Sequence, residues 1–294
     1  MQNIDPIVSV IVCVKDMKFY LRQCIQSLSN QSFKNFEVIV VDDASKEAVA
    51  PSIKQFNDLR IECIRLNDSR GIPYCRNTGI KYAKGNIIFF TDADCVVDRN
   101  WIAQGLLSLE EEDVVGVEGK TYYVSEKYNP TFSDHICENK YGGQYMTGNI
   151  AYKKDILIQM KGFDEKYSYF EDRDLALRIL KRNKRIVFNH KMIAYAQKQK
   201  LTPNELLKRS HILKNRAYLF KRFKDKACVS WRIINPLSLA KILFPPITFV
   251  SLIFNKDKFK SKEDFNILPF TYLADLLARF ELWRICAEER IFLI

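Results

Sequence analysis

The stretch "NIIFFTDADC", residues 86–95, is an apolar run that ends in two aspartates one residue apart, Asp92 and Asp94. A short continuous apolar run predicts a strand that is covered on both faces. Carboxylates this close together repel each other unless a metal ion, a basic side chain or water lies between them. The stretch therefore predicts a buried strand with an acidic pair at its carboxyl end.

Working outward from this stretch, strand and helix patterns alternate with short connections. Further strands are predicted at residues 7–14, 36–45, 60–66 and 114–124, and helices at 17–29, 71–85 and 169–183. This alternation is typical of an α/β fold, with a Rossmann-like, mostly parallel sheet flanked by helices. With 294 residues, 47% of them apolar, the chain is long enough for one large α/β domain and an appendage.

A second acidic pair, Asp42 and Asp43, ends the strand predicted at residues 36–45. Ligands of open α/β sheets bind in the crevice beyond the carboxyl ends of the strands. Both acidic pairs are therefore expected to serve a site at that edge.

The glycine patterns that usually hold a dinucleotide or a triphosphate, G-x-G-x-x-G after the first strand and G-x-x-x-x-G-K-S/T, are absent from the chain. A cation held by carboxylates is another way to neutralise phosphate, and Mg²⁺ and Mn²⁺ prefer oxygen ligands. Asp92 and Asp94 are candidate ligands. A solvated turn or a helix cap would also explain two acids after a strand.

A second acidic group, Glu171, Asp172 and Asp174, stands at the start of the helix predicted at residues 169–183. Acids at this place complement the helix dipole, so decoration of the helix start is one interpretation. The like charges of neighbouring carboxylates also favour a raised pKa.

The motifs occur in an order that resembles the family 2 inverting glycosyltransferases, which use nucleotide sugars and have the GT-A fold. The resemblance covers roughly residues 7–195. It rests on "VSVIVCVKD" followed by "FEVIVVDDAS", on "SRGIPYCRNTGIKYAKGNIIFFTDADC", and on "MTGNIAYKKDILIQMKGFDEKYSYFEDRDLALRI". It implies a GT-A catalytic domain, expected here at residues 1–200.

The resemblance also implies a reaction. One hexose-type sugar would move from a nucleotide-diphosphate sugar to a hydroxyl of a glycan or polyprenyl-linked acceptor, with Mn²⁺ or Mg²⁺ as cofactor. Such a reaction belongs to the synthesis of cell-surface polysaccharides or glycoconjugates. The Q-x-x-R-W signature of processive synthases is absent, which favours a single addition.

Roles follow from the resemblance position by position. Asp43 would contact the nucleobase and Arg76 the nucleotide. Asp92 would lie near the ribose and the metal, and Asp94 would be the direct metal ligand. Asp172 would be the general base.

The resemblance also implies supporting roles for residues near the general base and the donor site. Glu171, Asp174 and Arg178 are expected to support the base. Where the family often has a small hydroxyl residue, an aromatic residue and Asn, this chain has Cys13, Val14, Lys15 and Asp16. Cys13 and Lys15 are expected to line the donor site. Lys15 would either contact a phosphate or be a solvated side chain. Because these residues depart from the family pattern, the family's usual preference for UDP is weakened.

The remaining candidate residues carry no recognisable pattern. His135, His190 and His211 lie far apart without ligand spacing, and Cys75 and Cys95 lack a paired base. The eight cysteines include no C-x-x-C pair, which favours a reduced, cytosolic setting. The first 14 residues carry an acid and no basic residue before their apolar run, which argues against a secretory signal peptide.

The last third of the chain is basic. Residues 201–294 hold 17 Lys and Arg against 9 Asp and Glu, a net charge of +8 out of +11. Residues 208–226 predict a basic amphipathic helix, and 265–294 an aromatic-rich interfacial stretch. Residues 233–254 are apolar, but their uncharged core of 13 residues is too short to span a bilayer, so a shallow or re-entrant segment is expected.

Residues 201–294 are therefore expected to form a helical region that binds the protein to the cytoplasmic face of the membrane as a peripheral protein. A basic helix packed on the catalytic domain, or a contact in a homo-oligomer, would explain the same residues.

Three rival functions use the same features. A sugar nucleotidyltransferase would want a glycine- and arginine-rich loop after the first strand, which the chain lacks. A module that binds nucleic acid through its basic tail would show salt-dependent affinity, but the apolar aromatic segments fit a membrane better, so no nucleic acid is expected. An inactive relative of the enzyme is the third.

Overall fold

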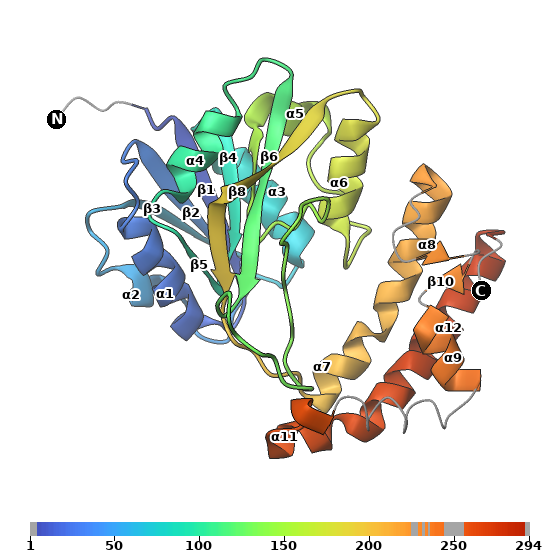
Figure 1. The fold of residues 1–294 in the computed structure, drawn as a ribbon. Helices are drawn as coiled ribbons and strands as arrows, with labels where there is room; N and C mark the ends of the chain where they lie inside the picture. The colour runs from blue at the N-terminus through green and yellow to red at the C-terminus, as the bar shows by residue number, and fades with distance from the viewer. Residues whose placement is uncertain (1–4, 225–228, 231–232, 235, 244–255, 292–294) are drawn as a thin grey trace. The chain divides into compact units, whose positions relative to one another are not determined.

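The computed structural model describes residues 5–224, 229–230, 233–234, 236–243 and 256–291. The chain divides into two compact units. We call residues 1–126 with 137–197 the N-terminal unit, and residues 127–136 with 198–294 the C-terminal unit. Figure 1 shows the elements of both.

The N-terminal unit is built on an eight-stranded mixed sheet with the strand order β3-β2-β1-β4-β7-β6-β8-β5. Its strands are β1 (Val8–Val14), β2 (Phe36–Asp42), β3 (Arg60–Arg65), β4 (Ile87–Asp92), β5 (Cys95–Val97), β6 (Val114–Tyr123), β7 (Ile150–Lys153) and β8 (Arg185–Ala196). Its helices are α1 (Lys18–Ser29), α2 (Ala50–Ile53), α3 (Ile72–Tyr82), α4 (Trp101–Ser108), α5 (Lys154–Gln159) and α6 (Glu171–Leu180).

The predicted fold class is confirmed. Strands β1 to β4 pair in parallel, as do β6 and β8, whereas β7 and β5 pair antiparallel to their neighbours. One predicted element differs: the strand expected at residues 86–95 is two strands, because the chain turns after Asp92 and Cys95 begins β5.

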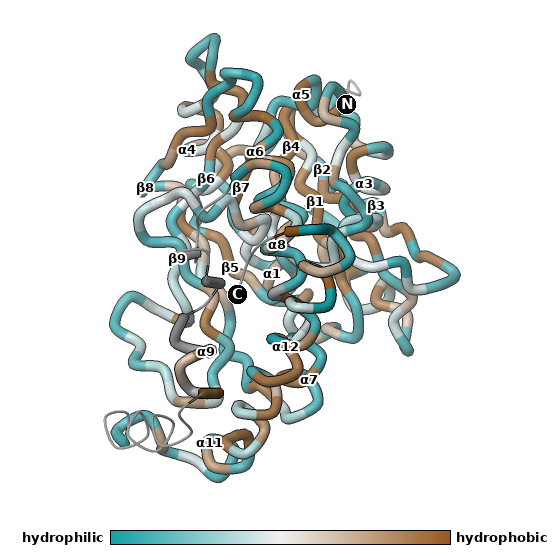
Figure 2. The backbone as a smooth tube through the Cα atoms, turned by 90° about the vertical axis from the view of Figure 1, so that its right-hand side faces the viewer, coloured by the Kyte–Doolittle hydropathy of each residue, from teal (hydrophilic) through white to brown (hydrophobic). Residues whose placement is uncertain are grey.

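The sheet is covered by helices on both faces, and each face has its own core. Because successive side chains of a strand point to opposite faces, Val10 and Val12 of β1 pack with α1, α2 and α4, and Ile11 packs with α3, α5 and α6. The central strands are accordingly hydrophobic along their length (Figure 2). Burial on both faces explains why these strands are continuous apolar runs in the sequence.

The C-terminal unit is mostly helical. Its elements are α7 (Pro203–Lys208), η1 (Arg209–His211), α8 (Ile212–Phe223), β9 (Val229–Ser230), β10 (Ile233–Ile234), α9 (Pro236–Leu243), η2 (Lys256–Lys258), α11 (Lys262–Asn266) and α12 (Leu268–Glu288). Residues 244–254 of the predicted shallow apolar segment lie outside the described residues.

Helix α8 falls within the basic amphipathic helix predicted at residues 208–226. Its Ala217 forms a core with Ala278, Leu282 and Ile285 of α12, and Tyr218 and Phe220 pack against that core. The apolar side of α8 is thus occupied by another helix of the same unit.

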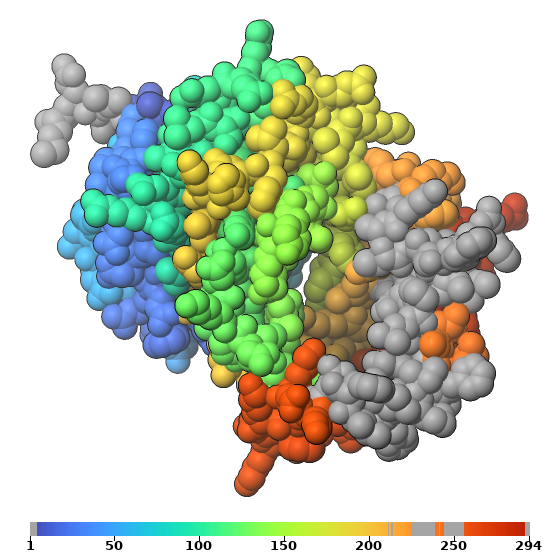
Figure 3. All heavy atoms as spheres, in the orientation of Figure 1, coloured from blue at the N-terminus to red at the C-terminus, as the bar shows by residue number. Residues whose placement is uncertain are grey.

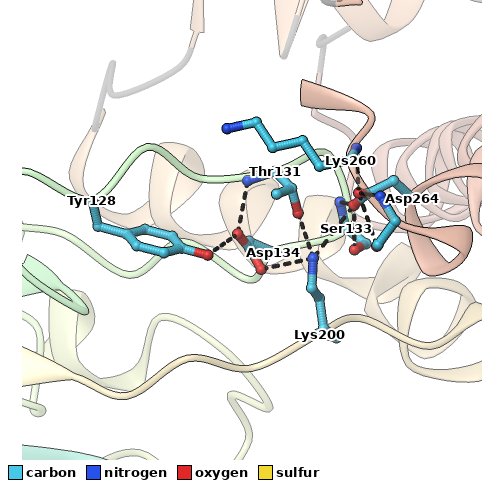
Figure 4. A network of polar contacts seen from close by, with 8 residues as sticks. Tyr128, Thr131, Ser133, Asp134, Lys200, Lys260 and Asp264 are labelled. Carbon is cyan, nitrogen blue, oxygen red and sulfur yellow. Dashed lines mark hydrogen bonds and ion pairs between the residues drawn. The ribbon is translucent and has the colours of Figure 1, made fainter. Parts of the chain in front are cut away.

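A polar network fastens residues 127–136 to the helices of the C-terminal unit (Figure 4). Asp134 accepts hydrogen bonds from the Tyr128 hydroxyl at 2.9 Å and the Thr131 backbone N–H at 2.7 Å, and it pairs with Lys200 at 3.2 Å. Asp264 accepts from the backbone N–H of Ser133 at 2.8 Å. Residues that are neighbours of β6 in the sequence therefore belong to the C-terminal unit.

Candidate active site

The predicted site residues of the first strands meet at one edge of the sheet. In the parallel register Cys13 of β1 lies opposite Asp92 of β4, and Val14 lies opposite Asp42 of β2. Asp43 follows directly, with its N–H bonded to the carbonyl of Val14 at 2.9 Å. Both acidic pairs thus lie at the carboxyl ends of adjacent strands.

Asp43 is buried and holds the start of α3 in place. Its carboxylate accepts hydrogen bonds from the N–H of Arg70 at 2.7 Å, the N–H of Gly71 at 3.2 Å and the hydroxyl of Ser69 at 2.7 Å. Gly71 has a φ of 85°, a left-handed conformation that glycine adopts without a steric penalty. Burial works to raise the pKa of Asp43, but these hydrogen bonds outweigh it and lower the pKa below its usual value.

The two other residues expected near the nucleotide lie beside Asp43. The exposed Lys15 donates to Ser69 at 2.7 Å, so it is linked to Asp43 through that hydroxyl. Cys13 is half-buried and packs beside the buried Cys75. Hydrogen bonding to Cys13, together with burial, raises the pKa of the Cys75 thiol, so this thiol stays protonated and is a poor nucleophile.

Arg76 joins the two acidic motifs. Its side chain is buried and donates to Asp92 at 3.2 Å and to Glu171 in a closer contact. Burial alone works to lower its pKa, but Glu171 and Asp92 outweigh it and raise the pKa, so the guanidinium stays charged. The D-x-D sequence and the start of α6, some 80 residues apart in the chain, are therefore neighbours in space.

Asp92, Asp94 and Cys95 form a group that could hold a metal ion, with one ligand atom of each lying within 4.8 Å of the others. Burial and the charge of Asp92 raise the pKa of Asp94 to about 7, a cost that a cation would relieve. Burial raises the pKa of the Cys95 thiol well above its usual value. Two carboxylates and a protonated thiol fit a hard cation such as Mg²⁺ or Mn²⁺, held by the oxygens.

Asp172 lies in the first turn of α6, half-buried, where it accepts from the backbone N–H of Arg173 at 2.7 Å and of Thr147 at 3.4 Å. Burial and the charge of Glu171 raise its pKa to about 7, against the opposite effect of Arg76. A carboxylate with such a pKa can accept a proton near neutral pH.

The residues assigned to support Asp172 divide into two groups. Glu171 contacts Arg76, as described above. Asp174 is fully buried and binds Arg178 at 2.7 Å, and Arg178 donates to the carbonyl of Gly162 at 2.8 Å. This pair fastens α6 to the turn after α5.

Two further residues that contact the loop and motifs described above carry no recognisable sequence signal. Glu118 of β6 is buried and accepts hydrogen bonds from Asn139 at 3.0 Å, from the N–H of Tyr145 at 2.9 Å and from the N–H of Gly143 in a closer contact. It thus folds the loop that leads to Thr147. A lone acid in a strand has no recognisable motif.

Gly148 is the second such residue. A Cβ on it would lie 3.1 Å from Oδ2 of Asp92 and 3.6 Å from the Cys95 sulfur. Thr147 touches Asp172 and the next residue adjoins Asp92, so two consecutive residues link the two motifs.

None of the site contacts given above involves a histidine whose side chain the structure describes. His135 lies in the C-terminal unit, where burial and Arg209 lower its pKa to about 4, so it stays neutral. His190 is exposed, and the side chain of His211 is outside the described part of the chain.

Several known proteins are similar to this chain in sequence or in fold. The family model for "Glycosyl transferase family 2" matches residues 9–163, more than half of the chain. The Escherichia coli protein "UDP-Glc:alpha-D-GlcNAc-diphosphoundecaprenol beta-1,3-glucosyltransferase WfaP" is 28% identical over 218 residues, which cover 71% of this chain and 86% of the relative. Glycosyltransferase GlyA of Streptococcus pneumoniae serotype 4 is 28% identical over 142 residues, but the matched part spans 20% of its length.

Among solved structures, the mannosyltransferase PcManGT from Pyrobaculum calidifontis, in complex with GDP-Man and Mn²⁺, is similar with a TM-score of 0.64. The match covers 96% of this chain and 88% of that one at 18% identity. At this identity the likeness shows the fold, which is GT-A.

Proposed function

This chain belongs to glycosyl transferase family 2, and from that premise we propose that it is a metal-dependent inverting enzyme. It moves one hexose-type sugar from a nucleotide-diphosphate sugar to a hydroxyl of a glycan or polyprenyl-linked acceptor. The observation that carries the proposal is the bridge made by Arg76, which contacts Asp92 at 3.2 Å and also Glu171, beside Asp172. Donor and acceptor motifs must adjoin for a direct transfer.

The donor side is formed by Asp43, Lys15 and the D-x-D aspartates. Ionised Asp43 accepts a hydrogen bond from a nucleobase, and uracil and guanine both present a ring N–H. Lys15, whose ammonium donates to Ser69, would contact a phosphate of the donor. Asp92 and Asp94 would hold a divalent cation, which when bound neutralises the diphosphate leaving group.

The acceptor side is formed by Asp172. Its carboxylate takes the proton from the acceptor hydroxyl as that oxygen bonds to the anomeric carbon. The bond from the anomeric carbon to the diphosphate breaks on the opposite side, and its electron pair leaves with the nucleotide. One displacement from the far side inverts the anomeric centre, and Asp172 ends protonated.

We further propose that the acceptor is used at the cytoplasmic face of the membrane, to which the enzyme is bound peripherally. Across the described ranges, no helix combines the length and the hydropathy that crossing a bilayer requires. The WfaP relative is named for a diphosphoundecaprenol-linked acceptor, which supports a lipid-linked substrate class.

The test is sugar release and transfer from a panel of UDP- and GDP-sugars with Mn²⁺, Mg²⁺ or EDTA. We expect turnover with one donor, loss with EDTA, and a fall of about 10²- to 10⁴-fold in kcat for Asp172→Asn. Asp94→Asn should abolish the response to metal. The exposed Asp58→Asn is the matched control and should retain wild-type turnover.

Full turnover by Asp172→Asn would refute the assignment of the base. Full turnover in EDTA would refute the metal dependence. A product that keeps the anomeric configuration of the donor would refute inversion.

A further inference from the structure

Helix α12 is apolar on two sides. Ala274, Ala278, Leu282 and Ile285 are buried, and the last three share a core with α8. The other side carries Leu273, Leu277, Phe280 and Trp283, which are 40%, 40%, 58% and 42% exposed. We call these four residues the exposed stripe.

The exposed stripe lies along one side of α12 and has the exposed Arg284 at its C-terminal end. Its members are spaced by four, three and three residues, which places them on one side of an α-helix. Phe265 of α11, 60% exposed, extends the stripe toward the N-terminus. Ile267, between the two helices, keeps backbone angles of the α region, so Phe265 lies about two turns before Leu273. A helix that is apolar on both sides is typical of one that is covered on both sides.

A row of exposed lysines adjoins the stripe at its N-terminal end: Lys256, Lys258, Lys260 and Lys262. We call these residues the lysine segment. Asp264 fixes it by accepting from the backbone N–H of Lys260 at 3.0 Å and of Ser261 at 2.8 Å. Figure 3 shows this segment, in orange-red, at the surface.

Aromatic stacking also holds the lysine segment in place. The ring of Phe259 stacks on Phe132 with centroids 4.6 Å apart and lies 5.2 Å from the ring of Phe265. The lysines and Phe265 are therefore presented together on an ordered surface.

The charge of the protein is concentrated in this unit. The C-terminal unit holds 20 of the 46 Lys and Arg but only 10 of the 35 Asp and Glu, a net charge of +10. The N-terminal unit has the remaining 26 and 25, a net charge of +1. Nearly all of the net positive charge thus belongs to the C-terminal unit.

We propose that the exposed stripe and the lysine segment dock the C-terminal unit on a membrane surface that contains anionic lipid. Helix α12 lies in the plane of the interface, with Phe280 and Trp283 at the acyl boundary. The lysines contact anionic headgroups, each strengthening binding by about fivefold. A second copy of the chain would also cover apolar residues, but it would bring two units of charge +10 together.

The sequence patterns favour both residues 208–226 and residues 265–294 for contact with lipid. In the structure the apolar side of α8 is buried against α12. Of these two helices, as far as the described residues go, α12 is the one with a second, exposed apolar side.

The test is flotation of the full chain with vesicles of phosphatidylcholine alone or with 30% phosphatidylglycerol. We expect at least tenfold stronger binding to the anionic vesicles, and weaker binding in 0.5 M NaCl. The double variant Phe280→Ser, Trp283→Ser should bind at least tenfold more weakly. Phe19→Ser, which removes a 67% exposed aromatic of α1 in the N-terminal unit, is the matched control and should bind as wild type.

Replacing the four lysines with Gln should remove the preference for anionic vesicles. Equal binding to both vesicle types, or wild-type binding by the Phe280→Ser, Trp283→Ser protein, would overturn the proposal. A dimer of the wild-type chain, seen by light scattering and absent in this double variant, would also overturn the proposal. A second copy of the chain would then cover the exposed stripe.

The inference rests on the proposed function only for its purpose, which is access to a lipid-linked acceptor. Membrane docking and glycosyl transfer can be tested independently of each other. The docking variants should transfer sugar to a water-soluble acceptor at the wild-type rate, and Asp172→Asn should bind vesicles like wild type.

Discussion

Asp172 and Glu171 are adjacent acids with different environments. Glu171 contacts Arg76, while Asp172 accepts hydrogen bonds from the backbone N–H groups of Arg173 and Thr147. The carboxylate without the guanidinium contact is the one whose pKa rises to about 7, because burial and Glu171 both disfavour its charge. The environment thus separates one structural acid from one acid suited to proton transfer.

This separation predicts a pH profile. With saturating Mn²⁺, kcat should increase about tenfold per pH unit below pH 7 and level off above it, because only ionised Asp172 accepts the proton. Glu171→Gln removes a like charge and should move the rising limb to lower pH. Glu47→Gln, at an exposed acid, should leave the limb unchanged. A limb that moves to higher pH in Glu171→Gln would contradict the assignment.

At the scale of elements, the strands that could be predicted are those with both faces covered. The patterns of β1, β2 and β4 are continuous apolar runs, and their carboxyl ends brought Asp43 and Asp92 to one edge as expected. Asp43 and Asp92 could be predicted from the sequence because each acidic motif stands at the carboxyl end of a recognisable strand.

The sequence patterns do not predict β5, β7 and β8 as separate strands. The first two have three and four residues, too few for a periodic pattern. Strand β8 has partly exposed side chains over much of its length and an irregular register with β6, which obscures the alternation. Their placement depends on tertiary pairing that no local pattern encodes.

The same limit applies to the loop before β7. Glu118 acts on Gly143 and Tyr145 from some 25 residues away, so its role exists only after folding. The closeness of Gly148 to Asp92 is likewise a property of the folded loop.

That closeness makes Gly148→Ala informative. The added methyl would lie 3.1 Å from Oδ2 of Asp92, so the carboxylate must move by a few tenths of an ångström. We expect about tenfold more Mn²⁺ to be needed for half-maximal activity, with a nearly unchanged thermal midpoint. An unaltered Mn²⁺ requirement would show that Asp92 is not positioned by this contact.

At the scale of the whole molecule, the C-terminal unit depends on a buried carboxylate. Asp264 is fully buried and bonded to Ser133, Ser261 and the N–H of Lys260, with Lys200 3.4 Å away. Burial works to raise its pKa, but the hydrogen bonds from Ser133 outweigh it and lower the pKa, so the acid stays ionised in the folded state at neutral pH.

Asp264→Ala should therefore cost about 3 kcal/mol of unfolding free energy, because it leaves buried donors without their acceptor. Urea unfolding followed by tryptophan fluorescence measures the loss. The exposed Asp257→Ala, in η2 of the same unit, is the control and should cost less than about 0.5 kcal/mol. Equal midpoints for both variants would show that the network does not stabilise this unit. Because the folded pKa is depressed, the contribution is present above the unfolded pKa, near 4, and is lost as pH falls through the folded value.

Residues 127–136 belong to the C-terminal unit, while the continuation of the same loop from residue 137 belongs to the N-terminal unit and leads to Thr147. A chimaera of two relatives therefore cannot be joined at a single crossover near residue 197. The donor of the C-terminal helices must also supply the matching ten-residue insert, or Phe132 and Asp134 would face foreign partners. Recombination among such enzymes is thus constrained to exchange two separated stretches of gene together.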